Sequence, residues 1–408
     1  MRDAKMLKSK LLYQLTFQSS WPTAVAFLGS EKKLVAGNQN GDLYYWKLPE
    51  NAPDEAAKES AEKKETASKD AVKAADCAPS VKLVGHTNSI SKLVYAKAQD
   101  TLLSASYDHT VRLWSCDQET KTTTEAILDQ DARQREFKKT KKEEVLKKPG
   151  IQIAALESVA VLQDHQDWIH TLALQEDGRQ AISGDASAEV IVWDLANRKL
   201  QRRWKGHPWN WIIAAALTAD GKQAAISEYR YKRDDFDIPS AALRLWNTES
   251  ASETLDLLQV QFPKLKTSDT SYGGSQQWRK FIAHGLVALA FSPDGKILAA
   301  AQGGETDTGK IHLLDTTNGK LIRTISGHQY GATDVHFSAD GKRIFSAGRD
   351  TCVRITQVDD GKELAVLGAP RGGQFKDWIS AIAIAPGEKV IAAADIAGQI
   401  NVWQLEET

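Results

Sequence analysis

The sequence contains few cysteines and no closely spaced cysteine pair. Cys77, Cys116 and Cys352 are the three cysteines among 408 residues. Their odd number and wide spacing argue against a disulfide framework and against a zinc site. We therefore expect the protein to come from a reducing compartment. We also expect that it binds no metal ion and no cofactor.

Long apolar runs and an excess of one charge are also missing. No apolar run reaches the roughly 18 residues that span a membrane, and the N-terminal residues contain no apolar core of signal-peptide length. The 52 basic and 53 acidic residues give a formal net charge of −1. No overall field then favours nucleic acid or an anionic membrane. We expect a cytoplasmic protein that binds neither nucleic acid nor membrane.

What the sequence does contain is one pattern that recurs along the chain. Its clearest copy, residues 323–358, has four short apolar runs, with a Gly-His pair after the first and an Asp-Gly turn between the second and third. An Asp-Gly pair accepts the positive φ of a tight hairpin, so the flanking runs should pair antiparallel. Seven copies of the strand-turn-strand core can be aligned, at residues 24–37, 92–106, 171–184, 214–227, 288–301, 334–348 and 381–394. Such recurrence indicates a repeat protein in which each copy forms one four-stranded sheet.

A third strand follows each core and often ends in tryptophan, as at Trp46, Trp114, Trp193, Trp246 and Trp403. Only Trp193-Asp194 spells the dipeptide Trp-Asp. On these features the chain resembles the WD-repeat family, and it is similar to bacterial members that are often uncharacterised. The resemblance implies an all-β fold, a seven-bladed β-propeller in which residues 1–408 form a single domain.

Repeats of this family share a hydrogen-bonded set of His, Ser, Asp and Trp. The second repeat matches the whole set with His86, Ser104, Asp108 and Trp114. The sixth repeat matches with His328, Ser346 and Asp350 but has Thr356 at the Trp position. In the third repeat His165, Ser183 and Trp193 fit, whereas Ser187 stands where Asp is expected. The resemblance implies a structural role for these residues, as a hydrogen-bond network within each blade.

The two ends of the chain should complete one blade together. Residues 11–17 form an apolar run ahead of the first repeat, and the seventh repeat lacks an outer strand of its own. If the N-terminal run supplies that strand, the ring closes and an exposed sheet edge disappears.

Insertions divide between the two faces of the expected ring. Residues 49–80 and 117–157 are charged, should be helical or disordered, and fall on one face in the family's topology. Loops 228–241, 263–282 and 302–309 fall on the opposite face, conventionally the top. Binding residues are often carried by loops on a rigid scaffold, so the top face is the expected binding surface.

Four tryptophans stand six residues before the end of an innermost strand: Trp21, Trp168, Trp211 and Trp378. Two interpretations are open for them. The indoles could ring the mouth of the central channel and bind a partner, or they could fill gaps between neighbouring blades, since large aromatics are common in both settings. Tyr330 and Trp209 lie one or two residues from equivalent positions and could join either arrangement.

Further candidates for partner binding lie in the top-face loops. They are Tyr229, Tyr231 and Arg233, with Trp278 and Arg279 in the next long loop. Aromatic and basic groups of this kind suit the acidic or phosphorylated side chains of a peptide. Neighbouring aspartates could instead neutralise the basic groups, so this alternative also stays open.

We therefore predict a non-catalytic scaffold, a monomeric ring that binds a protein or peptide partner through its top face. The alternative is a propeller hydrolase or lyase with top-face carboxylates around a metal ion, for which the candidates are Asp235, Asp237, Glu305 and Asp307. The residue one before the end of each innermost strand is small and apolar except at His336. A channel lined in this way offers an enzyme little chemistry, which favours the scaffold.

Overall fold

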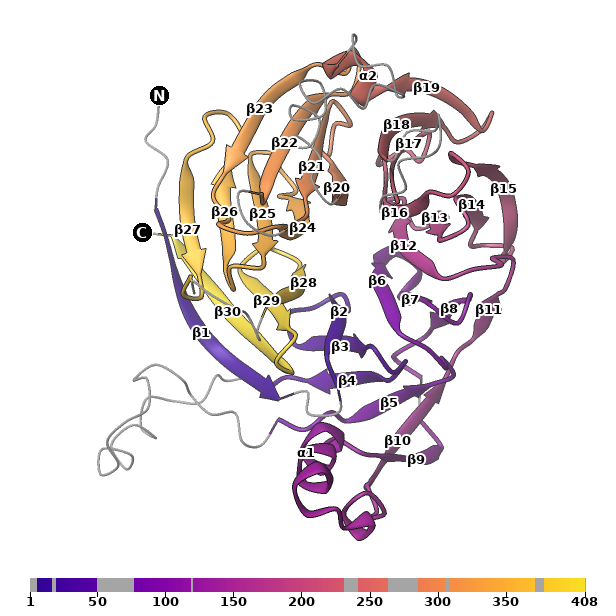
Figure 1. Ribbon diagram of the computed structural model, residues 1–408, viewed down its shortest axis with the longest axis vertical. Helices are drawn as coiled ribbons and strands as arrows, with labels where there is room; N and C mark the ends of the chain where they lie inside the picture. The colour runs from indigo at the N-terminus through magenta and orange to yellow at the C-terminus, as the bar shows by residue number, and fades with distance from the viewer. Residues whose placement is uncertain are drawn as a thin grey trace.

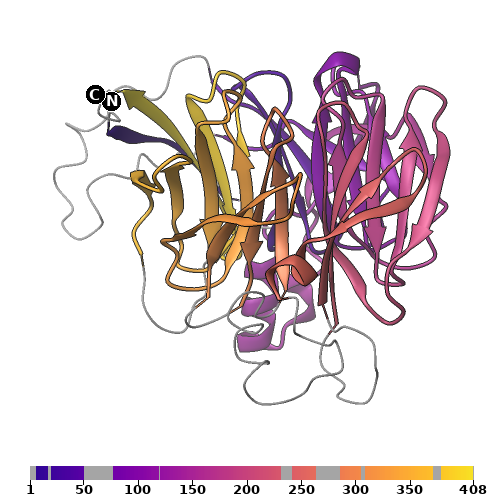
Figure 2. The same cartoon turned by 90° about the horizontal axis from the view of Figure 1, so that it is seen from above.

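The computed structural model describes residues 6–16, 20–49, 77–118, 120–230, 241–262, 285–304, 308–370 and 378–407. Seven sheets surround a central axis, as Figure 1 shows. Each innermost strand lies beside the innermost strand of the next sheet, and the last lies beside the first. Seen from above in Figure 2, the blades stand side by side around the ring. The all-β, seven-bladed propeller predicted from the repeats is therefore confirmed.

Strands are numbered along the chain, and each blade is described from the axis outward. Blade 1 contains β2 (Pro22–Phe27), β3 (Lys33–Asn38), β4 (Leu43–Lys47) and β5 (Val81–Val84). Blade 2 contains β6 (Ile90–Ala96), β7 (Thr101–Ser106), β8 (Val111–Trp114) and β11 (Ala160–Leu162). Blade 3 contains β12 (Ile169–Leu174), β13 (Gln180–Asp185), β14 (Glu189–Asp194) and β15 (Lys199–Lys205).

The remaining blades follow the same order. Blade 4 contains β16 (Trp211–Leu217), β17 (Gln223–Tyr229), β18 (Ala241–Asn247) and β19 (Ser252–Asp256), followed by α2 (Leu257–Gln261). Blade 5 contains β20 (Leu286–Phe291), β21 (Ile297–Gln302), β22 (Lys310–Asp315) and β23 (Leu321–Ser326). Blade 6 contains β24 (Ala332–Phe337), β25 (Arg343–Gly348), β26 (Val353–Gln357) and β27 (Glu363–Leu367). Blade 7 contains β28 (Ile379–Ile384), β29 (Val390–Asp395), β30 (Gln399–Glu407) and β1 (Leu7–Thr16).

The N-terminal strand closes the ring as expected. β1 pairs antiparallel with β30 from Leu7 opposite Glu407 to Thr16 opposite Gln399. Leu15 of β1 is fully buried and belongs to the same apolar cluster as Ile400 and Val402 of β30. The first strand in the sequence is thus the outermost strand of the last blade, and the edge of β30 is covered.

The hairpin turns behave as their sequences indicate. Gly341 of the Asp340-Gly341 turn has a φ of +70°. Ser338 Oγ donates a hydrogen bond to Asp340 Oδ1 at 2.6 Å and accepts one from the Arg343 N–H at 2.9 Å. These local bonds fix the register of β24 and β25, so that the apolar side chains of both strands point into the contacts between blades.

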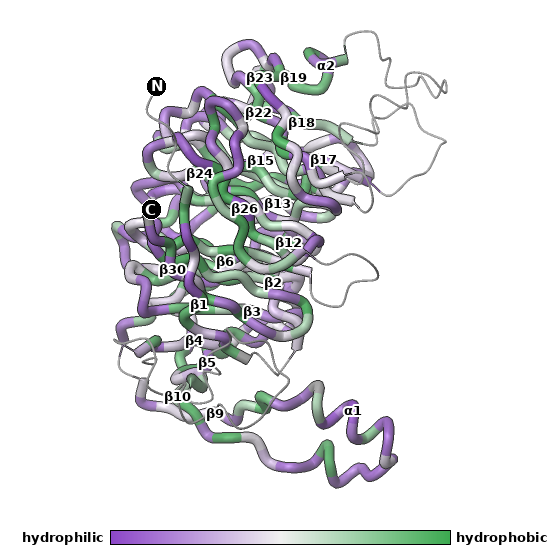
Figure 3. Tube along the Cα trace, turned by 90° about the vertical axis from the view of Figure 1, so that its left-hand side faces the viewer, coloured by the Kyte–Doolittle hydropathy of each residue, from purple (hydrophilic) through white to green (hydrophobic). Residues whose placement is uncertain are grey.

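Apolar contacts between blades form the core. One cluster joins Val35 and Leu43 of blade 1 to Leu93 and Trp114 of blade 2, and each further cluster likewise spans neighbouring blades. Figure 3 shows hydrophobic segments along the strands and mostly hydrophilic residues in α1 (Gln130–Thr140). Because neighbours share a core, loss of one blade would expose the surfaces of two others.

The insertion at 117–157 contains strands that the sequence analysis did not foresee. β10 (Ile151–Glu157) pairs in parallel with β5, and β9 (Thr122–Ala126) pairs antiparallel with β10, so blade 1 becomes a six-stranded sheet. α1 lies between them in the chain and projects beyond the rim of the ring in Figure 1. Threonines in β9 and alternating isoleucines in β10 favour strands over the predicted helix or disorder.

Two short 3₁₀ helices complete the described elements, at Lys97–Gln99 and Glu143–Val145. Within the described ranges no helix is both long and apolar enough to cross a membrane. Most of the first insertion, residues 50–76, lies outside the described residues, as do most of the loops at 228–241 and 263–282. The assignment of the insertions to opposite faces therefore stays a prediction.

Candidate functional site

One structural position unites the four predicted tryptophans. Trp168 directly precedes Ile169, the β12 residue that pairs with the end of β13 at Asp185. The same one-residue step precedes the equivalent pair in three further blades, at Trp21–Pro22, Trp211–Ile212 and Trp378–Ile379. We call the side of the ring on which the innermost strands begin the top face. All four tryptophans therefore stand where the chain enters the ring from that face.

Backbone hydrogen bonds hold this position independently of the indole. The carbonyl of Trp168 accepts a hydrogen bond from the N–H of Ala186 at 3.0 Å. Blade 2 has Ser89 at the equivalent place, and its carbonyl accepts from the N–H of Tyr107 at 2.9 Å. A serine thus keeps the same backbone contact, so the fold does not require tryptophan at this position.

Two of the tryptophans belong to a row of stacked rings that crosses blades 2 to 4. The rings of Trp168 and Tyr107 stack with centroids 5.2 Å apart and an interplanar angle of 6°. Tyr107 meets His170 edge to face at 5.1 Å, and His170 stacks on Trp211 at 5.6 Å. Trp168 is 47% and Trp211 42% exposed, so each keeps surface open to solvent. We call Trp168, Tyr107, His170 and Trp211 the aromatic row.

Polar contacts fix the middle of the aromatic row. Nδ1 of His170 lies 3.1 Å from the hydroxyl of Tyr107. Burial lowers the pKa of His170, and the negative charges of Asp167 and Asp185 oppose this only in part. The imidazole is therefore neutral at neutral pH, which suits a ring that stacks on an indole. The row is consequently a rigid, uncharged set of ring faces and edges.

Among the tryptophans in the described part of the chain, Trp209 is the most exposed. Its side chain is 72% exposed, and its backbone has a φ of +70°. Left-handed backbone costs roughly 1–2 kcal/mol for a residue with a side chain, and it is unusual for a bulky one. Such strain is concentrated at functional sites. The fold therefore presents Trp209 to solvent two residues before Trp211.

The other predicted aromatic residues are placed differently. Trp21 on blade 1 is 50% exposed. Trp378 is half-buried beneath the guanidinium of Arg349, whose carbon lies 4.3 Å from the ring centroid. Tyr330 is half-buried in the loop before β24. Tyr229 packs against the apolar cluster between blades 4 and 5, so its ring contributes to packing. These residues do not join the aromatic row.

Some predicted residues lie outside the described part of the chain. They are the partner-binding candidates Tyr231, Arg233, Trp278 and Arg279 and the carboxylates Asp235, Asp237, Glu305 and Asp307. Conversely, sequence reasoning missed Tyr107 and His170. Neither residue recurs at an equivalent position in the other repeats. They become part of the aromatic row only because the fold brings their rings into contact.

The predicted hydrogen-bond set is formed in blade 2. Nδ1 of His86 lies 2.7 Å from Asp108 Oδ2, and Nε2 lies 2.7 Å from Ser104 Oγ. The indole N–H of Trp114 donates to the same Ser104 Oγ at 2.8 Å. Burial raises the pKa of Asp108, but hydrogen bonds and the charge of His86 outweigh it and leave the pKa well below its usual range. Blade 6 repeats the first two contacts with His328, at 2.8 Å to Asp350 and 2.8 Å to Ser346.

In blade 3 the acidic partner of His165 differs from the sequence expectation. Ser187 does stand at the position that Asp108 has in blade 2. The carboxylate that contacts the histidine comes instead from Asp185 at the end of β13, whose Oδ2 lies 2.8 Å from His165 Nδ1. This residue pairs with the first residue of the innermost strand, or with the second residue in blade 4. Other blades carry a polar residue at this position too, namely Asn38, Ser106, Glu228, Gln302 and Asp395. A polar residue at the end of the second strand thus recurs in the sequence, and the sequence analysis did not use it to predict the partner of the histidine.

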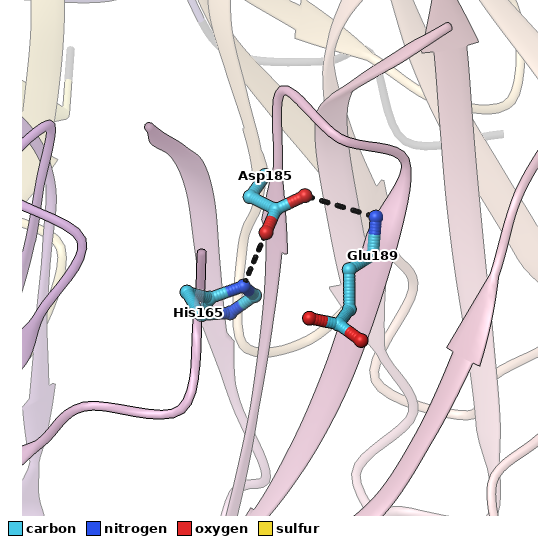
Figure 4. A group of neighbouring side chains, drawn as sticks. All are labelled: His165, Asp185 and Glu189. Carbon is cyan, nitrogen blue, oxygen red and sulfur yellow. Dashed lines mark hydrogen bonds and ion pairs between the residues drawn. The ribbon is translucent and has the colours of Figure 1, made fainter. Parts of the chain in front are cut away.

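Blade 3 also groups His165, Asp185 and Glu189 closely enough to suggest a metal site. Figure 4 shows that Asp185 instead bridges the His165 ring and the Glu189 backbone N–H. The second ring nitrogen of His165 is 2.6 Å from Ser183 Oγ. Both histidine nitrogens are therefore engaged in hydrogen bonds, and metal binding would require breaking one of them. This arrangement fits a structural brace.

Blade 4 holds a stronger version of the same brace. Glu228 is fully buried, accepts a hydrogen bond from the His207 N–H at 2.8 Å and forms an ion pair with Arg244. Burial alone would raise the pKa of Glu228, but the His207 hydrogen bond and the Arg244 charge lower it to about 2. The carboxylate is therefore ionised across the whole physiological range.

The channel lining is more polar than predicted. Lys92 of β6 and Asp334 of β24 form an ion pair with Nζ and Oδ1 3.0 Å apart. Blades 2 and 6 are separated along the ring by blades 1 and 7 (Figure 1), so this ion pair joins the innermost strands of two blades that are not neighbours. His336 lies 3.3 Å from the other Asp334 oxygen. Side chains alternate along a strand, so Asp334, two residues before His336, lines the same side.

Comparison with known proteins supports this architecture. A model described as "WD domain, G-beta repeat" matches residues 77–115, 156–194, 275–313 and 319–356. The first match begins just before the outer strand of one blade and ends after the third strand of the next, from β5 to β8. The matches at 156–194 and 319–356 likewise join the outer strand of one blade to the first three strands of the next, whereas the match at 275–313 covers strands of blade 5. This linkage is the same one by which β1 completes blade 7.

Similar proteins come from plants and insects. The chain is 24% identical to Autophagy-related protein 16 of Arabidopsis thaliana over 238 residues, which cover 58% of this chain and 39% of that protein. It is 30% identical to the WD repeat-containing protein 55 homolog of Drosophila ananassae over 122 residues, 29% of this chain and 24% of that protein. The matches thus span well under half of each relative. The expected bacterial type stays a prediction.

Proposed function

We propose that this seven-bladed propeller with WD40 repeats is a non-catalytic scaffold that binds a protein or peptide partner through its top face. The aromatic row, with Trp209 beside it in sequence, is the observation that carries the proposal. Trp and Tyr are enriched among the residues that dominate binding energy at interfaces. Clustered exposed rings on a folded domain indicate an interaction site.

The alternative interpretation of these tryptophans, packing between blades, has less support. Trp168 and Trp211 keep nearly half of their surface in solvent. The backbone carbonyl of Trp168 accepts the hydrogen bond that anchors this residue, so the bond does not depend on the indole. The positive φ at Trp209 is strained for a bulky residue, and its side chain is 72% exposed. Packing between blades explains neither the exposed surface of Trp168 and Trp211 nor the strained backbone of Trp209, whereas both features suit a surface that contacts a partner.

The geometry of the row also indicates how the partner binds. The stack is braced by the Tyr107–His170 contact, so little side-chain entropy is lost when a partner covers it. Its ring faces suit apolar, aromatic or proline-rich segments, which gain both buried area and stacking. Catalysis is not needed to account for any group in the aromatic row. We further infer a monomeric ring that binds no nucleic acid or membrane.

Trp168→Ala combined with Trp211→Ala tests the proposal. We expect this variant to lose at least about 2 kcal/mol of partner affinity, or roughly 30-fold, because both hot-spot candidates are removed. Its unfolding free energy should fall by less than about 1 kcal/mol, since nearly half of each side chain is exposed and the backbone hydrogen bond of Trp168 is kept. Affinity capture from lysate with quantitative mass spectrometry, followed by thermal unfolding, measures both quantities.

Leu321→Ala combined with Ile322→Ala is the matched control. These residues are 40% and 52% exposed on the outer strand of blade 5, away from the aromatic row. Partners should persist with the control and disappear with the tryptophan variant. Equal capture by both variants, or a loss of stability large enough to explain the missing partners, would contradict the proposal.

A further inference from the structure

The two tryptophans of the aromatic row do not use their indole N–H groups inside the protein. In blades 2 and 3 the buried Trp114 and Trp193 donate theirs to serine hydroxyls at 2.8 and 2.7 Å. Across the described part of the chain, neither Trp168 nor Trp211 donates its indole N–H to a protein acceptor. A polar N–H that a partner covers needs an acceptor from that partner. The row therefore offers two hydrogen-bond donors.

Acceptors are scarce in the aromatic row. The Tyr107 hydroxyl and Nδ1 of His170 lie 3.1 Å apart and satisfy each other. Nε2 of His170 is buried, so a partner cannot reach it. Asp167 Oδ1 accepts the backbone N–H of Trp168 at 2.8 Å. A segment that covers the row therefore fits best if it brings hydrogen-bond acceptors and few donors.

The chemistry of the peptide chain identifies such a segment. Most residues carry a backbone N–H, whereas proline carries none and keeps its carbonyl as an acceptor. Consecutive prolines form a polyproline II helix, whose carbonyls make no hydrogen bonds within the helix. On the row, an ordinary extended segment would remove water from its own N–H groups without gaining acceptors, which is unfavourable. A proline-rich segment avoids this loss.

The dimensions of the row suit the same segment. Three ring contacts with centroids 5.1 to 5.6 Å apart link the two indoles through Tyr107 and His170. A polyproline II helix rises about 3.1 Å per residue, so about six residues are enough to cover both indoles. The helix is formed before binding, so its segment loses little conformational entropy.

We propose that the aromatic row binds a proline-rich segment of the partner in the polyproline II conformation. Proline rings pack on the exposed faces of Trp168 and Trp211, and carbonyl oxygens of the segment accept the two indole N–H groups. Segments of this conformation generally dock on surfaces lined by aromatic rings. The inference rests on the proposed function, because it names the partner chemistry that the same surface recognises.

Titration of the full chain with acetylated decaproline tests the inference. The indole N–H resonances of Trp168 and Trp211, assigned with Trp168→Phe and Trp211→Phe, should shift and saturate with a dissociation constant of about 0.1–1 mM. The control is acetylated decaalanine, and both peptides carry two C-terminal lysines for solubility. We expect the alanine peptide to bind at least about 10-fold more weakly, because it brings an N–H at every residue and must be ordered on binding.

Trp168→Phe combined with Trp211→Phe isolates the contribution of the two donors. Phenylalanine keeps a ring at each position but has no N–H, so the fold should be retained while decaproline affinity falls about 10-fold. The backbone N–H of Ala186, which donates to the Trp168 carbonyl, reports binding in this variant. Trp168→Ala combined with Trp211→Ala should abolish the saturable shift.

Several results would overturn the inference. They are no saturable shift with decaproline, equal affinity for the alanine peptide, or unchanged decaproline affinity after Trp168→Phe and Trp211→Phe. Partner capture separates this failure from failure of the proposed function. If capture depends on Trp168 and Trp211 while decaproline does not bind, the proline-rich segment is wrong and the binding surface is right. If capture does not depend on them, both are wrong.

Discussion

Replacing Lys92 with methionine lowers the free energy of unfolding by about 3–5 kcal/mol, because it leaves a buried carboxylate without its lysine partner. Asp334 is almost fully buried in the channel wall. Burial alone raises the pKa of Asp334, but the charges of Lys92 and His336 lower it well below its usual range. Denaturant unfolding of the two proteins measures the loss.

Two further variants identify the cause of the stability loss in Lys92→Met. Lys147→Met removes a lysine whose ion pair with Glu143 is exposed, and it should change stability by less than about 0.5 kcal/mol. Adding Asp334→Leu to Lys92→Met removes the stranded charge and should recover most of the loss. If the double variant is as unstable as Lys92→Met alone, packing of the lysine stem explains the effect and the ion pair does not.

The second large effect is expected in blade 4. Glu228→Gln should destabilise the protein by about 3 kcal/mol at neutral pH, because buried Arg244 and His207 lose the carboxylate they share. The reference carboxyl has a pKa of 4.5, whereas in the folded chain the pKa is about 2. A depressed pKa contributes stability that is complete above the unfolded value and is lost as the pH falls through the folded value.

The lowered pKa of Glu228 can be tested by measuring stability as a function of pH. Stability of the natural protein should fall between about pH 5 and pH 2, and the part due to Glu228 should be absent from Glu228→Gln. The difference between the two proteins should therefore shrink from about 3 kcal/mol towards zero as the pH is lowered through this window. Parallel stability curves would show that Glu228 is not held ionised by His207 and Arg244.

Local patterns in the sequence were sufficient for the fold. The Asp340-Gly341 pair predicted one hairpin, the same pair recurs in four of the seven copies, and the recurring strand-turn-strand pattern as a whole predicted the seven sheets. The apolar run at 11–17 together with a seventh repeat short of one strand gave the closure that β1 (Leu7–Thr16) makes. The strands β9 and β10 were missed because the mixed charges around them mask a weak period of two, and only pairing with β5 makes them a sheet.

The candidate site could be predicted only in part. Trp168 and Trp211 were found because they repeat at one register position. Tyr107 and His170 come from different blades and occur once each, so no repeat pattern reveals them. Lys92 and Asp334 are 242 positions apart in the chain, and only closure of the ring brings them together. Contacts of this kind depend on the shape of the ring, which a local pattern does not contain.

Site-specific photo-cross-linking from position 209 tests the central proposal most directly. A photoreactive phenylalanine analogue replaces Trp209, and the same analogue at Ile322 on the outer strand of blade 5 is the control. We expect the partners recovered by affinity capture to cross-link from position 209 and not from position 322. Cross-links from position 322 alone, or equally from both, would show that the top face is not the surface that the partner contacts.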